Sequence, residues 1–341
     1  MAPAPPLLSV RGLTKHFPVK GGIFKRTVGV VQAVDAVSFD VAPGETLGIV
    51  GESGCGKSTT GRLLMRLTEP DSGEVDFAGE TIGARAGPSL RTLRRHMQMV
   101  FQDSYASLNP RLSVVTSVAY GPFAHGLRRS EAFERATVLL EAVGLDPGLY
   151  ADRYPHELSG GQRQRVNIAR ALAIEPRVVI LDEAVSALDK SVAAQVLNLL
   201  VDLKERFRLT YLFISHDLGV VRYLSDRVLV MYLGKVVEVG PVADVWAHPR
   251  HPYTRALLAA MPTMDPSRRT TEALLSGDPP NPINPPSGCR FRTRCRFAED
   301  VCAHREPPLL PLPGPAPHAV ACHMMPPDTG HSLAGTGGER A

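Results

Sequence analysis

The chain has 341 residues, 44% of them hydrophobic and 21% charged, and its formal net charge is +4. This is the composition of an ordinary soluble globular protein with one large domain and a smaller appendage. It contains no apolar run near the ~20 residues of a membrane span, and its mild positive charge does not indicate nucleic-acid binding.

Strand and helix patterns alternate along most of the chain. Apolar or alternating runs predict strands at residues 7–13, 33–41, 46–50, 74–77, 96–102, 177–182, 211–216, 227–232 and 235–239. Helical patterns occupy 58–67, 90–95, 103–174 (with 131–143 the clearest amphipathic part) and 191–207, and 18–30 reads as a hairpin loop. Strands alternating with helices predict an α/β fold whose mainly parallel sheet is covered on both faces.

A glycine-rich loop of the form G-x-x-x-x-G-K-S lies between the predicted strand 46–50 and helix 58–67. Its glycines let backbone N–H groups turn toward phosphate oxygens, and the following helix directs its positive end at the same anion. Lys57 can reach the β- and γ-phosphates, and the Ser58 hydroxyl can bind Mg²⁺. The predicted nucleotide-binding residues of this loop are Gly51, Glu52, Ser53, Gly54, Cys55, Gly56, Lys57, Ser58 and Thr59. We expect Cys55 to be a space-filling side chain.

Two adjacent carboxylates end a later apolar strand. Asp182 follows four apolar residues, so its carboxylate can reach the Mg²⁺ held by Ser58. Glu183 is placed to activate the water that attacks the γ-phosphate. Taken alone, the pair could equally be a solvated strand end.

A second possible anion-binding helix start occurs within the chain. It consists of Ser159, Gly160, Gly161 and Gln162, which open a predicted helix. One ATP does not need two such sites from one subunit, so we expect this site to serve a nucleotide held by a partner. The alternative is an N-capped helix with a flexible start.

These motifs, in this order, resemble the ATP-binding cassette (ABC) ATPases. The resemblance implies a P-loop NTPase nucleotide-binding domain with a RecA-like core, an antiparallel β subdomain, and a helical subdomain at about 103–174. It also implies that Phe17 stacks on adenine, that Gln102 senses Mg²⁺ and faces the membrane subunits, and that His216 contacts the γ-phosphate. Residues 159–162 match the signature motif, and residues 186–189, which end in Asp189, match the D-loop.

The match is closer to the ATPases of dipeptide and oligopeptide permeases, and nearest to the F-type subunit of the dipeptide system. It is carried by residues 100–111, 154–165 and 249–254, by the insertion between Phe17 and Ala33, and by the tail from 285 to 291. One departure is Ala184, where the family usually has Pro; alanine restores an N–H and frees φ, which predicts a looser turn.

The resemblance implies an ATPase that energises import of di- or oligopeptides. Its partners would be a paralogous ATPase subunit (or a second copy), two transmembrane permeases and, indirectly, an extracytoplasmic peptide-binding protein, with no nucleic acid. Residues 1–6 lack the features of a signal peptide, so we expect a peripheral location on the cytoplasmic face of the inner membrane. Alternatives are a nickel or sugar importer, a non-transport ABC protein acting on DNA or ribosomes, or a small-molecule P-loop kinase.

Four of the five cysteines fall in a short Pro-rich region: Cys289, Cys295, Cys302 and Cys322. Disulfides are disfavoured in the cytosol, and a segment too short for its own core could fold around a metal. The spacing leaves zinc and an iron–sulfur cluster open, while the resemblance implies a [4Fe–4S] cluster on these four residues. The alternatives are zinc or plain thiols, and the arginines at 290, 292, 294 and 296 could offset thiolate charge or form a solvated face.

The domain organisation predicted from these patterns has four parts. Residues 1–255 form the nucleotide-binding domain, 256–286 a linker, 287–325 the Cys-rich segment and 326–341 a disordered tail.

Overall fold

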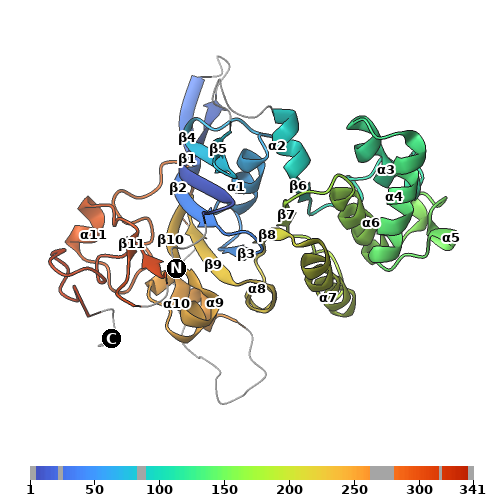
Figure 1. The fold of residues 1–341 in the computed structure, drawn as a ribbon. Helices are drawn as coiled ribbons and strands as arrows, with labels where there is room; N and C mark the ends of the chain where they lie inside the picture. Colours follow the sequence, from blue (N-terminus) through green and yellow to red (C-terminus); the bar gives the residue numbers. More distant parts are fainter. Residues whose placement is uncertain (1–4, 22–25, 83–89, 262–279, 315–316, 337–341) are drawn as a thin grey trace.

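The computed structural model describes residues 5–21, 26–82, 90–261, 280–314 and 317–336 (Figure 1). Its centre is a sheet in the order β11-β12-β10-β9-β3-β8-β7-β6. The parallel strands are β3 (Thr46–Val50), β6 (Met97–Val100), β7 (Val178–Asp182), β8 (Thr210–Ile214) and β9 (Arg227–Tyr232). The antiparallel edge comprises β10 (Lys235–Pro241), β11 (Leu310–Pro311) and β12 (Ala319–Val320). The predicted mainly parallel sheet is therefore confirmed.

A second, antiparallel sheet has the order β2-β1-β4-β5. Its strands are β1 (Leu8–Gly21), β2 (Arg26–Val41), β4 (Ser72–Phe77) and β5 (Glu80–Thr81). The hairpin loop predicted at 18–30 is wrong for most of its length, since Pro18 pairs with Val30 inside the β1–β2 ladder. The glycines there suggested a loop, but Val28, Val30 and Val31 favour extended backbone and carry the ladder on.

Helices surround the central sheet. The described helices are α1 (Lys57–Leu64), α2 (Leu90–His96), α3 (Val114–Ala124), α4 (Arg129–Ala142), α5 (Pro147–Tyr150), the 3₁₀ turn η1 (Pro155–Glu157), α6 (Gly160–Leu172), α7 (Lys190–Phe207), α8 (Leu218–Leu224), α9 (Val242–Ala247), α10 (Pro252–Ala259) and α11 (Asp300–His304). Helices α3 to α6 gather at one end of the molecule, where the sequence predicts a helical subdomain (Figure 1). None of the helices in the described ranges is long and apolar enough to cross a bilayer.

The central strands bury both of their faces. Successive side chains of a strand point to opposite sides, so Leu181 and Phe213 join the core with the helical subdomain. Their neighbours Ile180 and Leu212 join a second core, which lies against the antiparallel sheet and α1. This explains why these strands read as continuous apolar runs.

The described parts of the region after the central strands are more regular than their composition suggests. The linker predicted at 256–286 begins inside α10 (Pro252–Ala259), and residues 262–279 lie outside the described ranges. At the end of that predicted linker, the Gln32 N–H donates to the Pro282 carbonyl at 3.4 Å, and Ile283 forms a bridge with Val31 of β2. The proline-rich composition indicates a linker, but the backbone at Pro282 and Ile283 pairs with β2 of the antiparallel sheet.

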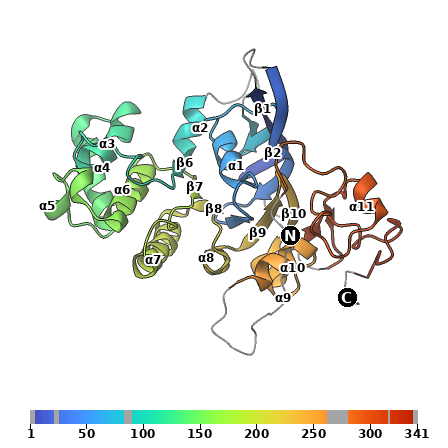
Figure 2. The ribbon, with the colours of Figure 1, turned by 180° about the vertical axis from the view of Figure 1, so that it is seen from behind.

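The Cys-rich segment, taken here as residues 287–325, lies at the end of the molecule opposite α3–α6 in both views (Figures 1 and 2). Its strand β12 pairs with β10 and so extends the central sheet. The sequence predicts a disordered tail over 326–341, but the described part, 326–336, contacts this segment. The buried His331 ring bonds the Phe297 carbonyl at 2.8 Å, and the Ser332 N–H donates to Glu299 at 2.9 Å.

The backbone of residues 249–254, which leads into α10, is hydrogen-bonded to β10 through the buried carboxylate of Glu238. Glu238 of β10 accepts the backbone N–H groups of Arg250 at 2.8 Å and His251 at 2.9 Å. The His251 Nδ1 in turn accepts the Tyr253 N–H at 3.0 Å, which caps α10. Burial lowers the pKa of His251 to about 4, because the charged ring would lose both solvent and this acceptor role.

The buried histidine predicts an acid-sensitive fold. The pKa of His251 is depressed in the folded state, so its contribution to stability is full above about pH 6.5 and is lost as pH falls toward 4. Between pH 7 and pH 5 we expect a loss of about 2 kcal/mol from this group. The variant His251→Asn keeps an acceptor but cannot titrate, so its free energy of unfolding should change less over that interval. Denaturant unfolding at both pH values checks this, and parallel losses in the two proteins would contradict it.

Candidate functional site

The glycine loop lies against backbone on two sides. A Cβ added to Gly51 would lie 2.2 Å from the Met231 carbonyl oxygen, and one added to Gly56 would lie 2.1 Å from the Ala33 carbonyl oxygen. Gly56 also has φ of 106°, which L side chains rarely adopt. Glycine is therefore required at both positions, and the loop follows β3 and opens α1 as the motif predicts.

The two polar side chains at the start of α1 already have partners. The Lys57 Nζ donates to the carbonyls of Gly51 at 2.8 Å and Glu52 at 3.0 Å, which holds the ammonium inside the loop. The Ser58 hydroxyl donates to Asp182 Oδ1 at 2.7 Å. A hydroxyl and a carboxylate in contact are the oxygen ligands that Mg²⁺ prefers.

Asp182 is almost fully buried at the end of β7. Burial raises the pKa of its carboxyl, and the neighbouring Glu183 raises it further, although the Ser58 hydrogen bond and nearby cations oppose this. A divalent cation beside the carboxylate would remove most of that desolvation cost. The environment therefore favours cation binding next to Ser58.

Glu183 is held between two polar side chains from other strands. The Gln102 amide, two residues after β6, donates to Glu183 Oε2 at 2.9 Å, and His216 Nδ1 lies 3.3 Å from Glu183 Oε1. Glu183 has φ of 49°, an uncommon conformation for a residue with a Cβ, and such strain is often found at functional sites. The two predicted catalytic residues, Glu183 and His216, thus meet the predicted Mg²⁺-sensing residue Gln102 at one point.

These residues line one cavity of about 460 Å³ beside the glycine loop. It is lined by Ala33, Ser53, Gly54, Gly56, Lys57, Ser58, Thr59, Gln102, Glu183 and His216. Its lining combines donors of the glycine loop with the Glu183 carboxylate. This arrangement suits a triphosphate bound at the loop and a water activated by Glu183.

Other predicted residues lie outside this cavity. Ser159 caps α6, accepting the Gln162 N–H at 3.3 Å while the Gln162 side chain accepts the Ser159 N–H at 2.9 Å. Gly161 packs so closely on Val192 of α7 that a Cβ would lie 2.4 Å from it, and Gly160 approaches Leu188 of the D-loop. The predicted signature and D-loop are thus neighbours of each other, and neither lines this chain's own cavity.

Three more predicted residues have distinct surroundings. Asp189 caps α7 by accepting the Val192 N–H at 2.9 Å. Phe17 on β1 is 39% exposed, and the Lys15 ammonium lies over its ring, 5.5 Å from the centroid. Cys55 is buried behind the loop, where burial raises the pKa of its thiol, so it is a packing residue and not a reactive thiolate.

The four cysteines expected to hold an iron–sulfur cluster are not arranged as metal ligands in this structure. Within the described ranges no group of three or more His, Cys, Asp or Glu side chains is arranged to hold a metal ion. Cys289, Cys295, Cys302 and Cys322 do line one small cavity together, next to His323. Burial raises the pKa of Cys289 and of Cys322 to about 12, so these thiols are neutral as placed.

Two residues that no sequence pattern indicated, Tyr253 and Arg294, bind the glycine loop at Glu52. The Glu52 N–H donates to the Tyr253 hydroxyl at 2.9 Å. Arg294 donates to both carboxylate oxygens of Glu52, at 2.8 and 3.1 Å. Tyr253 lies in residues 249–254, which carry part of the family resemblance, and Arg294 lies among the arginines at 290–296. No local pattern indicates that either side chain reaches the loop.

The sequence matches the ABC transporter family over residues 34–186, and the C-terminal region of the oligopeptide/dipeptide transporter family over residues 237–302. It is 53% identical to the probable peptide ABC transporter ATP-binding protein y4tS of Sinorhizobium fredii, across 94% of this chain and 90% of the relative. It is 50% identical to the oligopeptide transport ATP-binding protein AppF of Bacillus subtilis, across 93% and 97%.

Solved structures share the fold. The chain is similar to cbiO1 from Clostridium perfringens, part of the ABC transporter complex cbiONQ, with a TM-score of 0.61, 30% identity and coverage of 71% of this chain and 91% of that one. It is also similar to the ATP-binding cassette MJ0796, solved as a dimer bound to ADP and Pi, with a TM-score of 0.60, 29% identity and coverage of 69% and 98%.

The close backbone contacts predict a sharp difference between two glycines of the loop. Gly56→Ala should lower the free energy of unfolding by about 3 kcal/mol or more, because a Cβ there meets the Ala33 carbonyl in a disfavoured conformation. Gly54→Ala faces open space at φ of 77°, so it should cost only about 1 kcal/mol. Denaturant unfolding without nucleotide measures both, and equal losses would show that backbone approach does not set the shape of the loop.

Proposed function

The chain belongs to the ABC transporter ATPases of the oligopeptide and dipeptide import family, and from that premise we propose how its site works and what it assembles with. It is the ATP-binding subunit of a peptide importer, in which ATP hydrolysis energises transport. The observation that carries the mechanism is the Glu183 carboxylate held between Gln102 and His216 beside the glycine loop.

In the proposed mechanism the glycine loop and Lys57 bind the β- and γ-phosphates. Ser58 and Asp182, with Gln102, would hold Mg²⁺, which when bound neutralises charge developing on the phosphates. Glu183 accepts a proton from the attacking water, and His216 contacts and orients the γ-phosphate. The Phe17 ring would stack on the adenine base.

We propose that the site is completed by a second ATPase subunit. Residues 159–162 lie beside the D-loop and do not line this chain's own cavity. Ser159 and Gln162 bond each other in the cap of α6, and this helix start would serve a partner's nucleotide. The similar ATP-binding cassette MJ0796, which forms a dimer bound to ADP and Pi, supports this arrangement. Closure would then depend on ATP binding the closed pair more tightly than the open one.

We also propose the partners with which the chain assembles and its location. The partner is a paralogous ATPase subunit, with a second copy of this chain as the alternative. Two transmembrane permeases would contact the Gln102 region, a peptide-binding protein would act from outside, and the chain would lie on the cytoplasmic face of the inner membrane. This is supported by family membership and by the position of Gln102, which joins the catalytic carboxylate to the start of the helical subdomain.

We also propose that the four cysteines bind a metal centre, a [4Fe–4S] cluster with zinc as the alternative. All four thiols line one cavity, and thiolate ligation would offset the cost that keeps them neutral when unliganded. When bound, such a centre would cross-link a segment with little core of its own.

Glu183→Gln tests the catalytic assignment. We expect ATP binding to persist, hydrolysis to fall by at least about 10²-fold because the base is lost, and ATP to trap a dimer. Turnover is measured on the reconstituted transporter, and dimer mass by light scattering with and without the paralogous subunit. Glu141→Gln, the same change on the exposed face of α4, is the matched control. Unimpaired turnover would remove Glu183 as base, and a monomer under ATP would refute the two-subunit site.

The cysteine proposal predicts a coloured, iron-containing protein. Anaerobically purified chain should contain about four irons and absorb in the visible range, and Cys289→Ser or Cys322→Ser should remove both signals. Cys55→Ser, which changes a thiol away from the cavity, should leave them intact. Stoichiometric zinc in a colourless protein would replace the cluster with the zinc alternative, and protein with neither metal would leave four plain thiols.

A further inference from the structure

We propose that Arg294 is a positioning residue for the ATP site: from the Cys-rich segment it holds Glu52 and so fixes the phosphate-binding loop. The inference rests on the ATPase function proposed above. It does not depend on what, if anything, the four thiols bind.

The contact between the two residues is bidentate. Arg294 Nη1 and Nη2 donate to the two carboxylate oxygens of Glu52 at 2.8 and 3.1 Å. The side chains are only 5% and 21% exposed, so solvent screens the pair weakly. A planar guanidinium matched to a carboxylate fixes orientation as well as distance, which a lysine could not do.

Glu52 is anchored by each of its polar groups. Its carboxylate binds Arg294, its N–H donates to Tyr253, and its carbonyl accepts from the Lys57 ammonium at 3.0 Å. Glu52 is the second residue of the loop, so its backbone sets where the following N–H groups point. A loop held in this way before ATP arrives loses less conformational freedom on binding, which favours affinity.

The Cys-rich segment is well fixed where it makes this contact. Phe291, three residues before Arg294, packs edge-on against Tyr232 at 5.3 Å and tilted against Tyr253 at 5.4 Å between ring centroids. The aromatic contacts of Phe291 and the Arg294–Glu52 ion pair therefore hold the same turn against the domain. Because Tyr253 also contacts Glu52, both sets of contacts reach the glycine loop.

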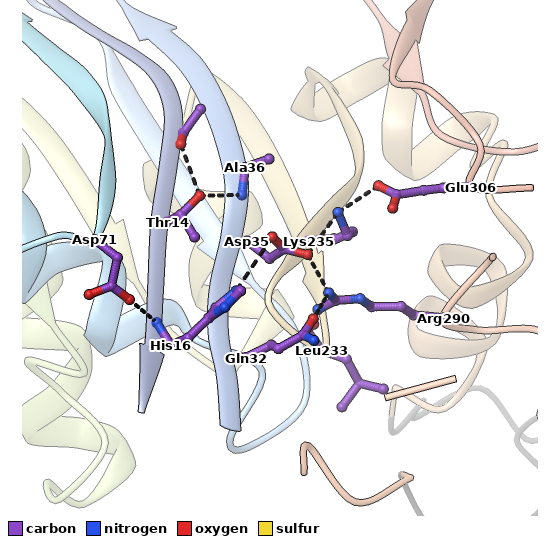
Figure 3. A network of polar contacts seen from close by, with 11 residues as sticks. Thr14, His16, Gln32, Asp35, Ala36, Asp71, Leu233, Lys235, Arg290 and Glu306 are labelled. Atoms are coloured by element: carbon purple, nitrogen blue, oxygen red, sulfur yellow. Dashed lines mark hydrogen bonds and ion pairs between the residues drawn. The ribbon is translucent and has the colours of Figure 1, made fainter. Parts of the chain in front are cut away.

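A second arginine of the same turn is clamped on the other side. Figure 3 shows Arg290 directed at Asp35 of β2, with further hydrogen bonds to Gln32 and the Leu233 carbonyl. His16 of β1 lies 3.5 Å from the other oxygen of Asp35, and it precedes Phe17. The segment thus contacts the domain at Asp35 of β2 and at Glu52, and Arg294 makes its contact with the glycine loop itself.

The test is nucleotide affinity of the full chain in its transporter complex. Arg294→Ala should raise the Kd for a fluorescent ATP analogue and the KM for ATP about tenfold, with kcat at saturating ATP nearly unchanged. Arg292→Ala is the matched control, since Arg292 bonds Ser287 within its own segment and should leave affinity unchanged. If Arg294→Ala does not fold, Arg294→Lys keeps the charge but loses the paired contact, and a smaller rise in Kd is expected.

A double-mutant cycle separates positioning from general support of the fold. If Arg294 acts through Glu52, then Arg294→Ala in a Glu52→Gln background should weaken binding much less than in the wild type. Equal effects in both backgrounds, or wild-type affinity in the folded Arg294→Ala protein, would overturn the proposal. Wild-type complex that binds no ATP would instead refute the proposed function. Iron and zinc contents equal to wild type show that the variant acts on the loop and not through loss of a metal.

Discussion

The close approach of backbone to backbone at the phosphate-binding loop is the constraint on which the rest of the site depends. Gly51 lies against Met231 of β9 and Gly56 against Ala33 in the middle of β2, so both strands must be in place before the loop can take its shape. From this fixed point the other site residues follow from strand order. Gln102, Glu183 and His216 come just after β6, β7 and β8, at the edge of the sheet where ligands of α/β folds bind.

The parts that could be predicted from the sequence are those encoded by short patterns. The glycine loop, the carboxylates at 182–183 and the capped start of α6 each combine local turn chemistry with a recognisable strand or helix, and their elements appear close to where the sequence predicts them. Propensity misled at residues 18–30, where Gly21 and Gly29 lie inside the β1–β2 ladder and do not end it. Local composition cannot show that a partner strand continues the pairing across these glycines.

The contacts between distant parts of the chain could not be predicted. Arg294 is separated from Glu52 by 242 positions, and nothing near either residue identifies the other. The arginines between 290 and 296 read as a basic face or as counter-charges for thiolates, whereas two of them pair with carboxylates of the nucleotide-binding domain. Such ion pairs form only when the Cys-rich segment docks on the nucleotide-binding domain. The aromatic contacts of Phe291 and the strand pairing of β12 set that docking.

The long separation between Glu52 and Arg294 has a consequence for biosynthesis. A ribosome adds roughly 5–20 residues per second, so the 242 intervening positions take roughly 12–48 seconds to translate. During that interval β3 and α1 have emerged, but the carboxylate of Glu52 has no arginine and the edge of β10 has no β12. Chains that end between His216 and the Cys-rich segment would keep every recognised ATPase motif and still lack the Arg294–Glu52 contact. The nascent chain therefore passes through a stage at which its motifs are complete and its nucleotide loop is not.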